Sequence, residues 1–168
     1  WFQYSRNQGM LGAEQEKLMA PDISMGGNYA YDSLGQFYHT ATIYGYIKKD
    51  DVLCSYKSLL AILNSKLCWW FVQNTGAVMA NGFYRYKTAY ISPFPLPSDE
   101  TILSEEKNLE LLVDKVIKAK AEGNESEIHN CESKIDEIVY NLYNLDKEER
   151  AAIDIADFRN IAINNDSE

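Results

Sequence analysis

Arg85 and Lys87 stand two residues apart in the sequence, and aromatic and amide side chains surround them. Cations bind the phosphates of nucleic acids, a guanidinium group can donate two hydrogen bonds to guanine, and the amide of Asn81 could do so to adenine. Tyr84 offers a flat ring on which a base can stack. These four residues predict contacts with DNA. The structural alternative is that tyrosines on a strand form a packed face and that the cations form its solvated face.

The segment that carries these residues has the two-residue period of a β-strand. One predicted face holds Tyr84, Tyr86, Thr88 and Tyr90, and the other holds Phe83, Arg85, Lys87, Ala89 and Ile91. Three alternating prolines, the last at Pro97, then prevent both ladder hydrogen bonds and a continued helix. We therefore expect a strand that packs on a core with one side, presents cations on the other and leads into a stiff exit.

The charge of the chain divides at Pro97. Residues 1–97 carry eight Lys and Arg against six Asp and Glu, whereas residues 98–168 carry eight against nineteen, which together give the net charge of −9. Eighteen of the twenty-one aromatic residues also lie before residue 98. We therefore predict two parts: a domain at 1–97 that carries the recognition chemistry, and a helical part at 98–168 that spaces or docks it.

Periodicity predicts both strands and helices. The first fifty residues read as short strands and turns, with strand alternation from Tyr38 to Tyr44. Residues 55–74 place apolar side chains at three- and four-residue steps, which indicates one core helix. Asn64 and Ser65 interrupt the middle of this helix with poor helix formers, whose side chains compete for backbone hydrogen bonds.

Two longer helices are predicted beyond the prolines. Residues 109–119 and 128–142 share one pattern of apolar steps, and a glycine followed by Asn124 separates them. This pattern predicts an antiparallel helical hairpin, with a last short helix at about 146–157 that begins at Asp146. The predicted fold class is α+β: a mixed, curved sheet packed on the core helix and followed by the hairpin.

The sequence carries no motif for several other classes of site. It has no Gly-rich phosphate loop, no HExxH pair and no G-x-S-x-G elbow, so no catalytic centre is predicted. The three cysteines are widely spaced, with no histidine placed as a zinc ligand, and are expected to be reduced and buried. The longest apolar run, LCWWFV, is far shorter than the roughly 18 residues that indicate a membrane span. We expect a soluble, cytoplasmic protein that contacts no membrane and, because it opens on Trp1, a piece of a longer polypeptide.

Three segments in order resemble one family. They are LLAILNSKLCWWFV at 59–72, GFYRYKTAYISPFPLP at 82–97 and KIDEIVYNLYNLDKEERAAI at 134–153. They resemble the L-N-S helix, the strand with a proline exit and the I-D-x-x-V-Y-x-L-Y helix of the TaqI-like C-terminal specificity domain. That domain is the DNA target-recognition part of type IIG and related restriction-modification adenine methyltransferases. By this resemblance, Asn64 and Ser65 belong to the helix motif, and we expect them to hydrogen-bond to neighbouring loops.

The resemblance implies that residues 1–97 are a DNA target-recognition domain that binds double-stranded DNA and positions an adenine. An upstream methyltransferase domain of the same polypeptide would bind S-adenosylmethionine and flip the base, so this chain is expected to have no cofactor, no metal and no activity alone. The family differs most where it touches DNA, so base-reading residues are not carried over from it. The candidates, chosen for their chemistry and their position near these motifs, are Arg6, Lys17, Asn81, Tyr84, Arg85 and Lys87.

Two other functions stay open from the sequence. The acidic hairpin could dock a protein partner through its apolar seam. The twelve tyrosines and three tryptophans could instead line a pocket for a small ligand or a sugar.

Overall fold

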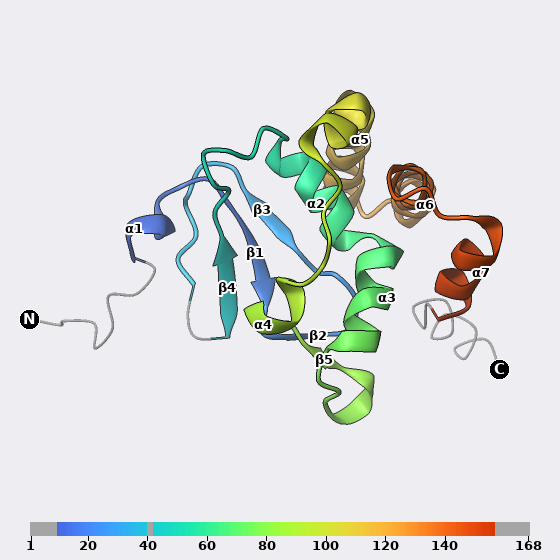
Figure 1. The fold of residues 1–168 in the computed structure, drawn as a ribbon. Helices are drawn as coiled ribbons and strands as arrows, with labels where there is room; N and C mark the ends of the chain where they lie inside the picture. The colour runs from blue at the N-terminus through green and yellow to red at the C-terminus, as the bar shows by residue number, and fades with distance from the viewer. Residues whose placement is uncertain (1–9, 40–41, 157–168) are drawn as a thin grey trace, which may run out of the picture.

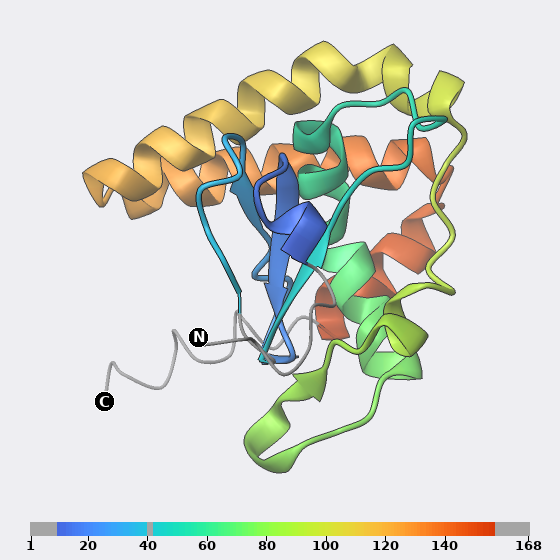
Figure 2. The ribbon, with the colours of Figure 1, turned by 90° about the vertical axis from the view of Figure 1, so that its left-hand side faces the viewer.

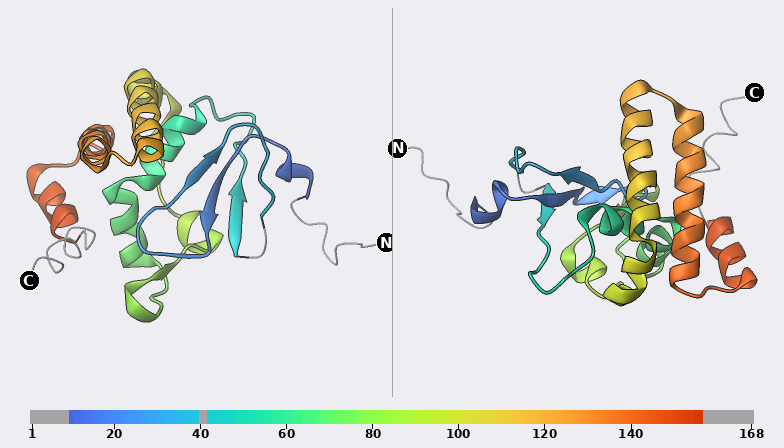
Figure 3. Two further views of the ribbon diagram at one scale, coloured as in Figure 1. Left: turned by 180° about the vertical axis from the view of Figure 1, so that it is seen from behind. Right: turned by 90° about the horizontal axis from the view of Figure 1, so that it is seen from above.

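A computed structural model of the chain describes residues 10–39 and 42–156, and its elements lie in successive layers. From left to right in Figure 1, a small sheet comes first and is followed by helices α2 (Tyr56–Asn64) and α3 (Lys66–Thr75). Helices α5 (Asp99–Glu122), α6 (Glu125–Leu142) and α7 (Lys147–Ala156) come after these. Figure 3 shows from above that α5 and α6 run side by side. Two short helices are α1 (Met10–Ala13) and α4 (Thr88–Ile91), of which α4 contacts α3. The α+β class is confirmed.

The strands form two small antiparallel sheets. Strands β1 (Lys17–Pro21), β3 (Ala30–Asp32) and β4 (Ile43–Tyr46) pair in the order β3-β1-β4. Strand β2 (Ile23–Ser24) pairs with β5 (Tyr84–Arg85). Every pairing between these named strands is antiparallel, so the mixed sheet that we expected is corrected. Parallel neighbours need a crossover of a dozen or more residues. The connection between the neighbours β1 and β3, residues 22–29, is shorter than that, so this pair can only be antiparallel.

The core helix predicted at 55–74 is two helices, α2 and α3, that meet at Ser65. Ser65 has an extended conformation, with φ −66° and ψ 159°. Its hydroxyl donates to the carbonyl of Ile62 and accepts from the N–H of Cys68, so this residue ends α2 and caps the start of α3. A serine favours such a cap over a helix interior because its side chain competes for backbone hydrogen bonds. The break turns α3 away from the axis of α2.

Asn64 ties the end of α2 to the strand region. Its amide oxygen accepts from the N–H of Tyr29 at 2.8 Å, and its amide nitrogen donates to the carbonyl of Tyr29 at 3.0 Å. One side chain therefore satisfies both backbone groups of a buried residue, as a neighbouring strand would. The expectation that Asn64 and Ser65 hydrogen-bond to neighbouring loops is confirmed for Asn64, whereas Ser65 bonds to the backbone of α2 and α3.

The long strand predicted over 83–91 is also corrected. Regular pairing ends after Arg85, although the N–H of Tyr86 still donates to the carbonyl of Asp22 at 2.7 Å. The partner strand β2 is only two residues long, so the chain beyond Tyr86 has no strand to pair with and turns into α4 at Lys87. In the same way, the strand expected over 38–44 is observed as β4 at 43–46, and residues 40–41 lie outside the described ranges.

The helical hairpin is confirmed. Gly123 ends α5 in the left-handed conformation, with φ 67°, and Asn124 caps α6 by accepting from the N–H of Glu127. The seam residues are buried or half-buried between the helices. Asp146 accepts from the N–H groups of Glu148 and Glu149 and so begins α7, as predicted.

One apolar core runs through both parts of the chain. Its buried members are drawn from successive elements and include Leu18, Ile62, Leu109, Val139 and Ile153. Helix α5 packs on α2, and α7 packs on α3. The hairpin is therefore packed on the first part, and the division at 97 stays a prediction about function. The three cysteines are free and buried, as expected. Within 10–39 and 42–156, none of the helices combines the length and apolar character that crossing a membrane requires.

Lys17 belongs to the interior of the fold. It is 1% exposed, and its Nζ lies 2.5 Å from a carboxylate oxygen of Asp32 and 2.7 Å from the carbonyl oxygen of Ala13. The carboxylate of Asp32 also accepts from the N–H groups of Gln36 and Phe37. The pair therefore joins β1 to β3 and to the turn that follows. Our expectation that Lys17 contacts DNA is corrected, because its ammonium group is enclosed.

Replacing Asn64 by alanine should lower the free energy of unfolding by at least about 1–3 kcal/mol, because two buried backbone groups of Tyr29 lose their partner. Chemical denaturation measures the change. The control is Asn108→Ala, which removes an exposed amide whose side chain, among the described residues, donates to Glu105 alone, and it should change stability little. Equal stability of the two variants would contradict the structural role of Asn64.

Replacing Lys17 by methionine should destabilise the protein by about 3–5 kcal/mol, because it leaves a buried carboxylate without its counter-charge. The matched control is Lys57→Met, which removes an ion pair to Asp114. The side chains of Lys57 and Asp114 are 29% and 55% exposed, so this substitution should cost about 1 kcal/mol or less.

The same pair predicts a pH dependence. Burial raises the pKa of Asp32, but hydrogen bonds from Lys17 and from the N–H groups of Phe37 and Gln36 outweigh it and hold the pKa well below its usual 3.8. A depressed pKa stabilises the fold above the unfolded value, and that stabilisation is lost as the pH falls below it. Stability measured from pH 6 to pH 2 should therefore fall below about pH 4. The fall should be shallower in Lys17→Met, and identical acid profiles would contradict this.

Candidate nucleic-acid interface

Residues 77–85 form a β-hairpin, which we call the arm. The bridge between Val78 and Tyr84 pairs its two sides, and the N–H of Met79 donates to the carbonyl of Phe83 at 2.7 Å. The turn, Ala80–Gly82, has positive φ at Asn81 (61°) and at the glycine after it (77°), as in a type I′ turn. Asparagine and glycine tolerate these angles, which explains why they occupy the tip.

The arm projects from the body of the molecule. Figures 1 and 2 show it below α3 and at the opposite end from α5 and α6. Its second side pairs with β2, since Ile23 is opposite Arg85 and Ser24 is opposite Tyr84. Residues 83–85 therefore run between two antiparallel neighbours, 77–79 and β2. Side chains directly opposite each other share a face, so the arm has an inner and an outer face.

The inner face of the arm is fixed to α3 by aromatic packing. Tyr84 packs edge-on against Trp69, with ring centroids 5.3 Å apart and an angle of 88°. Tyr86, which is 0% exposed, stacks parallel to the same indole at 6.5 Å and donates its hydroxyl to the carbonyl of Gly26. The ring of Tyr84 is therefore half-buried and anchors the arm, and its face toward Trp69 is not available for stacking on a base.

Arg85 lies in the middle of the outer face. Its side chain is 32% exposed, and its Nε lies 3.5 Å from the carboxylate of Asp22. Tyr44 donates its hydroxyl to the other oxygen of that carboxylate at 2.9 Å, and this bond raises the pKa of Tyr44. Within 10–39 and 42–156, no hydrogen bond engages the terminal nitrogens of Arg85. Asp22 thus lies beside the Nε of the guanidinium group as an ion-pair partner, and the terminal nitrogens are left to donate to an external acceptor.

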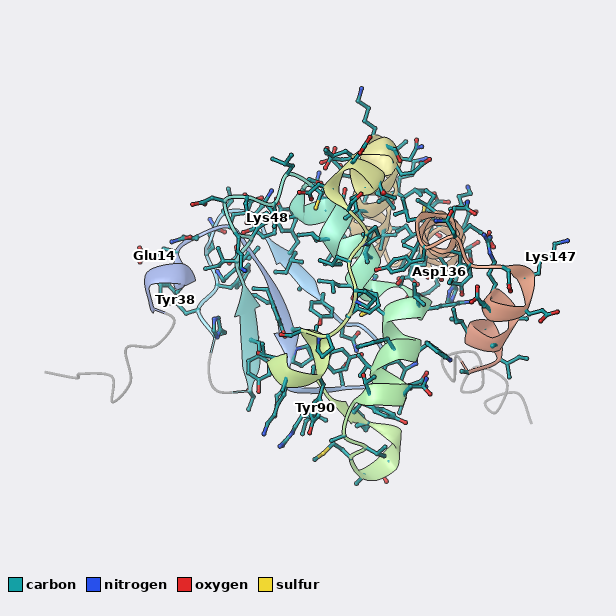
Figure 4. All side chains as sticks on the ribbon, viewed as in Figure 1. Glu14, Tyr38, Lys48, Tyr90, Asp136 and Lys147 are labelled. Carbon is teal, nitrogen blue, oxygen red and sulfur yellow. The ribbon has the colours of Figure 1, made fainter. Side chains whose placement is uncertain are left out.

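Lys87 and Asn81 complete the polar part of the site. Lys87 is exposed at the start of α4 and has no ion pair with another described residue. Asn81 is exposed at the tip of the arm. Figure 4 places Tyr90 of α4 at the same end of the molecule, whereas Lys48 and Lys147 lie elsewhere on its surface. The structure therefore brings together four of the six predicted residues: Asn81, Tyr84, Arg85 and Lys87.

Of the other two candidates, Lys17 does not join this group. Lys17 is enclosed beside Asp32, and Arg6 lies outside the described residues. The sequence also contains two signals for the arm that the predictions did not use. Asn-Gly at 81–82 is a strong hairpin signal between two apolar segments. From Val52 to Ser98 the chain has four cations and no acidic residue, which marks the segment as the part best suited to a polyanion.

Comparison with known proteins agrees with this geometry. The TaqI-like C-terminal specificity domain matches residues 1–96, which include the sheets, α2, α3, the arm and α4. The hairpin and α7 lie beyond the match, so the landmark at 134–153 is not part of it. Among curated proteins, none is similar enough in sequence to count as a match. The chain belongs to the family of TaqI-like C-terminal specificity domains, whose role is DNA recognition in restriction-modification enzymes.

Proposed function

We infer that this chain recognises the target sequence of a larger restriction-modification enzyme, an adenine-N6 DNA methyltransferase, and that the arm contacts the duplex. The observation that carries the inference is that the exposed Asn81 and the partly exposed Arg85 lie on one projecting hairpin of a specificity domain, with the exposed Lys87 directly after it. A two-stranded β-ribbon fits the major groove of B-DNA, which is about 12 Å wide. Toward its tip, beyond the pairing of Ser24 with Tyr84, the arm is a two-stranded ribbon of this kind.

Each exposed polar residue has a distinct proposed role. Lys87 contacts a phosphate and helps to fix the position of the arm. Arg85, held by Asp22 through its Nε side, donates to the O6 and N7 atoms of guanine. Asn81 at the tip donates to and accepts from adenine or a neighbouring backbone group. Tyr84 supports the arm from its inner face, a role that replaces the stacking expected from the sequence.

The catalytic chemistry is assigned to another part of the polypeptide. An upstream methyltransferase domain would bind S-adenosylmethionine and take the adenine out of the helix. This chain would position the DNA and would itself need neither a cofactor nor a metal. The proposal places the whole enzyme in the cytoplasm, where it meets DNA.

The charge distribution predicts weak binding by this chain alone. Eight cations stand against six acidic residues in 1–97, and Lys17 is enclosed, so few phosphates can be neutralised. The acidic helices α5 and α6 lie at the far end of the molecule from the arm (Figure 2). At physiological salt the Debye length is about 8 Å, so their charge is largely screened at the arm. Most of the affinity would come from the rest of the enzyme.

The two alternative functions fit the structure less well. The seam of the hairpin is buried within the chain, so docking through it would require the hairpin to open. A docking surface would instead use the exposed large apolar residues of α5, which are Leu103, Leu111 and Ile117. The groove of about 570 Å³ between residues 25–31 and the hairpin is lined by two tyrosines and two lysines among mostly aliphatic and small side chains, which is not the aromatic pocket expected for a sugar.

Replacing Arg85 by alanine should weaken binding to random duplex DNA more than Lys118→Ala does, because Lys118 is 75% exposed on α5 at the far end of the molecule. Titration at about 50 mM salt measures both affinities, and unchanged thermal midpoints serve as the control for folding. Equal losses for the two variants would remove Arg85 from the interface.

Replacing Lys87 by alanine should lower the slope of log affinity against log salt by about one between roughly 50 and 200 mM, because one phosphate contact is lost. An unchanged slope would mean that Lys87 contacts no phosphate. Binding of the unaltered chain that does not vary with salt would count against DNA recognition altogether and would favour a protein partner.

A further inference from the structure

The outer face of the arm is apolar around its arginine. Arg85 and Phe83 share this face because they lie two residues apart, and Ile23 shares it because it is opposite Arg85. Met79 is opposite Phe83, and the methyl group of Met25 lies 3.6 Å from where a β-carbon on Gly82 would stand. Ile23, Met25 and Phe83 are 39%, 41% and 38% exposed. Phosphate contacts and hydrogen bonds to bases do not account for this cluster.

A cluster of exposed apolar side chains on a soluble domain marks an interaction surface. The occupant of this one must accept hydrogen bonds from Arg85 and cover apolar side chains next to it. The only described carboxylate beside the arginine, that of Asp22, already accepts from Tyr44. The neighbouring Lys87 adds a second positive charge. Charge complementarity therefore favours a polyanion that also offers apolar groups.

The major groove of DNA meets both requirements. Guanine presents two acceptors there, and thymine presents its 5-methyl group, which apolar side chains contact. The minor groove carries no such methyl group. The polar tip of the arm, Asn81 and Gly82, argues against an apolar wedge driven between bases, because the apolar side chains lie on a face of the ribbon and not at its end.

We propose that the apolar outer face of the arm reads thymine methyl groups near the guanine read by Arg85, with Phe83 and Met25 as the contacting residues. This inference rests on the proposed function, since it requires the arm to lie in the major groove. Residues two apart on a strand are about 6.8 Å apart, and successive base pairs are about 3.4 Å apart. With the arm along the groove, the thymine read by Phe83 lies about two base pairs from the guanine.

The test uses the full 168-residue chain and pools of random duplex DNA at about 50 mM salt. One pool is synthesised with thymine and the other with uracil, which keeps base pairing and lacks only the methyl group. Selection from the thymine pool should enrich a site with thymine about two base pairs from a guanine. Replacing that thymine by uracil in the selected duplex should weaken binding about four-fold, the effect of one buried methyl group.

Matched variants assign the effect to the outer face. Phe83→Ala should bind the thymine and uracil duplexes equally, and Met25→Ala should reduce the difference. Val78→Ala is the control, because Val78 is 67% exposed in the same arm but lies opposite Tyr84 on the other face. The control should keep the four-fold discrimination. Discrimination that persists in both Phe83→Ala and Met25→Ala would overturn the assignment.

The remaining outcomes separate the two proposals. Binding of the selected duplex that uracil does not weaken overturns the thymine inference and leaves DNA recognition by the arm in place. No enrichment and no binding from either pool overturns the proposed function and the inference with it.

Discussion

Packing around the indole of Trp69 is the contact on which the interface depends. The indole lies between α3 and the arm, where it touches both Tyr84 and Tyr86. Tyr86 in turn packs on Tyr29, which packs on Tyr46 of β4. This chain of rings connects the helix, the arm and the three-stranded sheet. Aromatic pairs add about 0.5–1.5 kcal/mol each beyond the area they bury, so they hold the base of the projecting hairpin together with its pairing to β2.

The acidic character of the second part of the chain has a structural use. Carboxylates on the hairpin accept hydrogen bonds from the start of both core helices: Glu106 from the N–H of Ser55, and Asp136 from the N–H of Lys66. Negative charge is favourable at a helix N-terminus, so these contacts orient the hairpin on α2 and α3. Part of the acidic excess beyond residue 97 is therefore explained by packing, without a partner for the hairpin.

The position of the arm relative to this acidic surface has a consequence for recognition. Its outer face combines one oriented guanidinium group with aliphatic and aromatic side chains, and the acidic helices lie at the other end of the molecule (Figure 1). A domain that reads bases needs such local chemistry more than a large net charge, because phosphate contacts give affinity without sequence information. The family match covers the arm and stops before the helical hairpin, so the residues that we propose for recognition lie within the matched residues 1–96.

Local signals were sufficient for the second half of the chain. The apolar steps of 109–142, the left-handed Gly123 and the cap at Asn124 concern residues within a few positions of one another, so the sequence predicted the hairpin correctly. The α+β class and the buried, free cysteines were predicted for the same reason. The Asn-Gly turn of the arm was equally readable but was missed within an assumed long strand.

Contacts between distant residues decided the rest. Lys17 has the same charge as Lys87, and only its pairing with Asp32, fifteen residues away, places one inside and the other on the surface. The extent of β5 depends on its partner β2, whose first residue, Ile23, lies opposite Arg85. The position of the Tyr84 ring depends on its packing against Trp69. Charge, helix periodicity and turn chemistry are properties of neighbouring residues, and the sequence by itself determined them. Which side chains reach the surface together depends on how the strands and helices pack, so only the tertiary structure decided it.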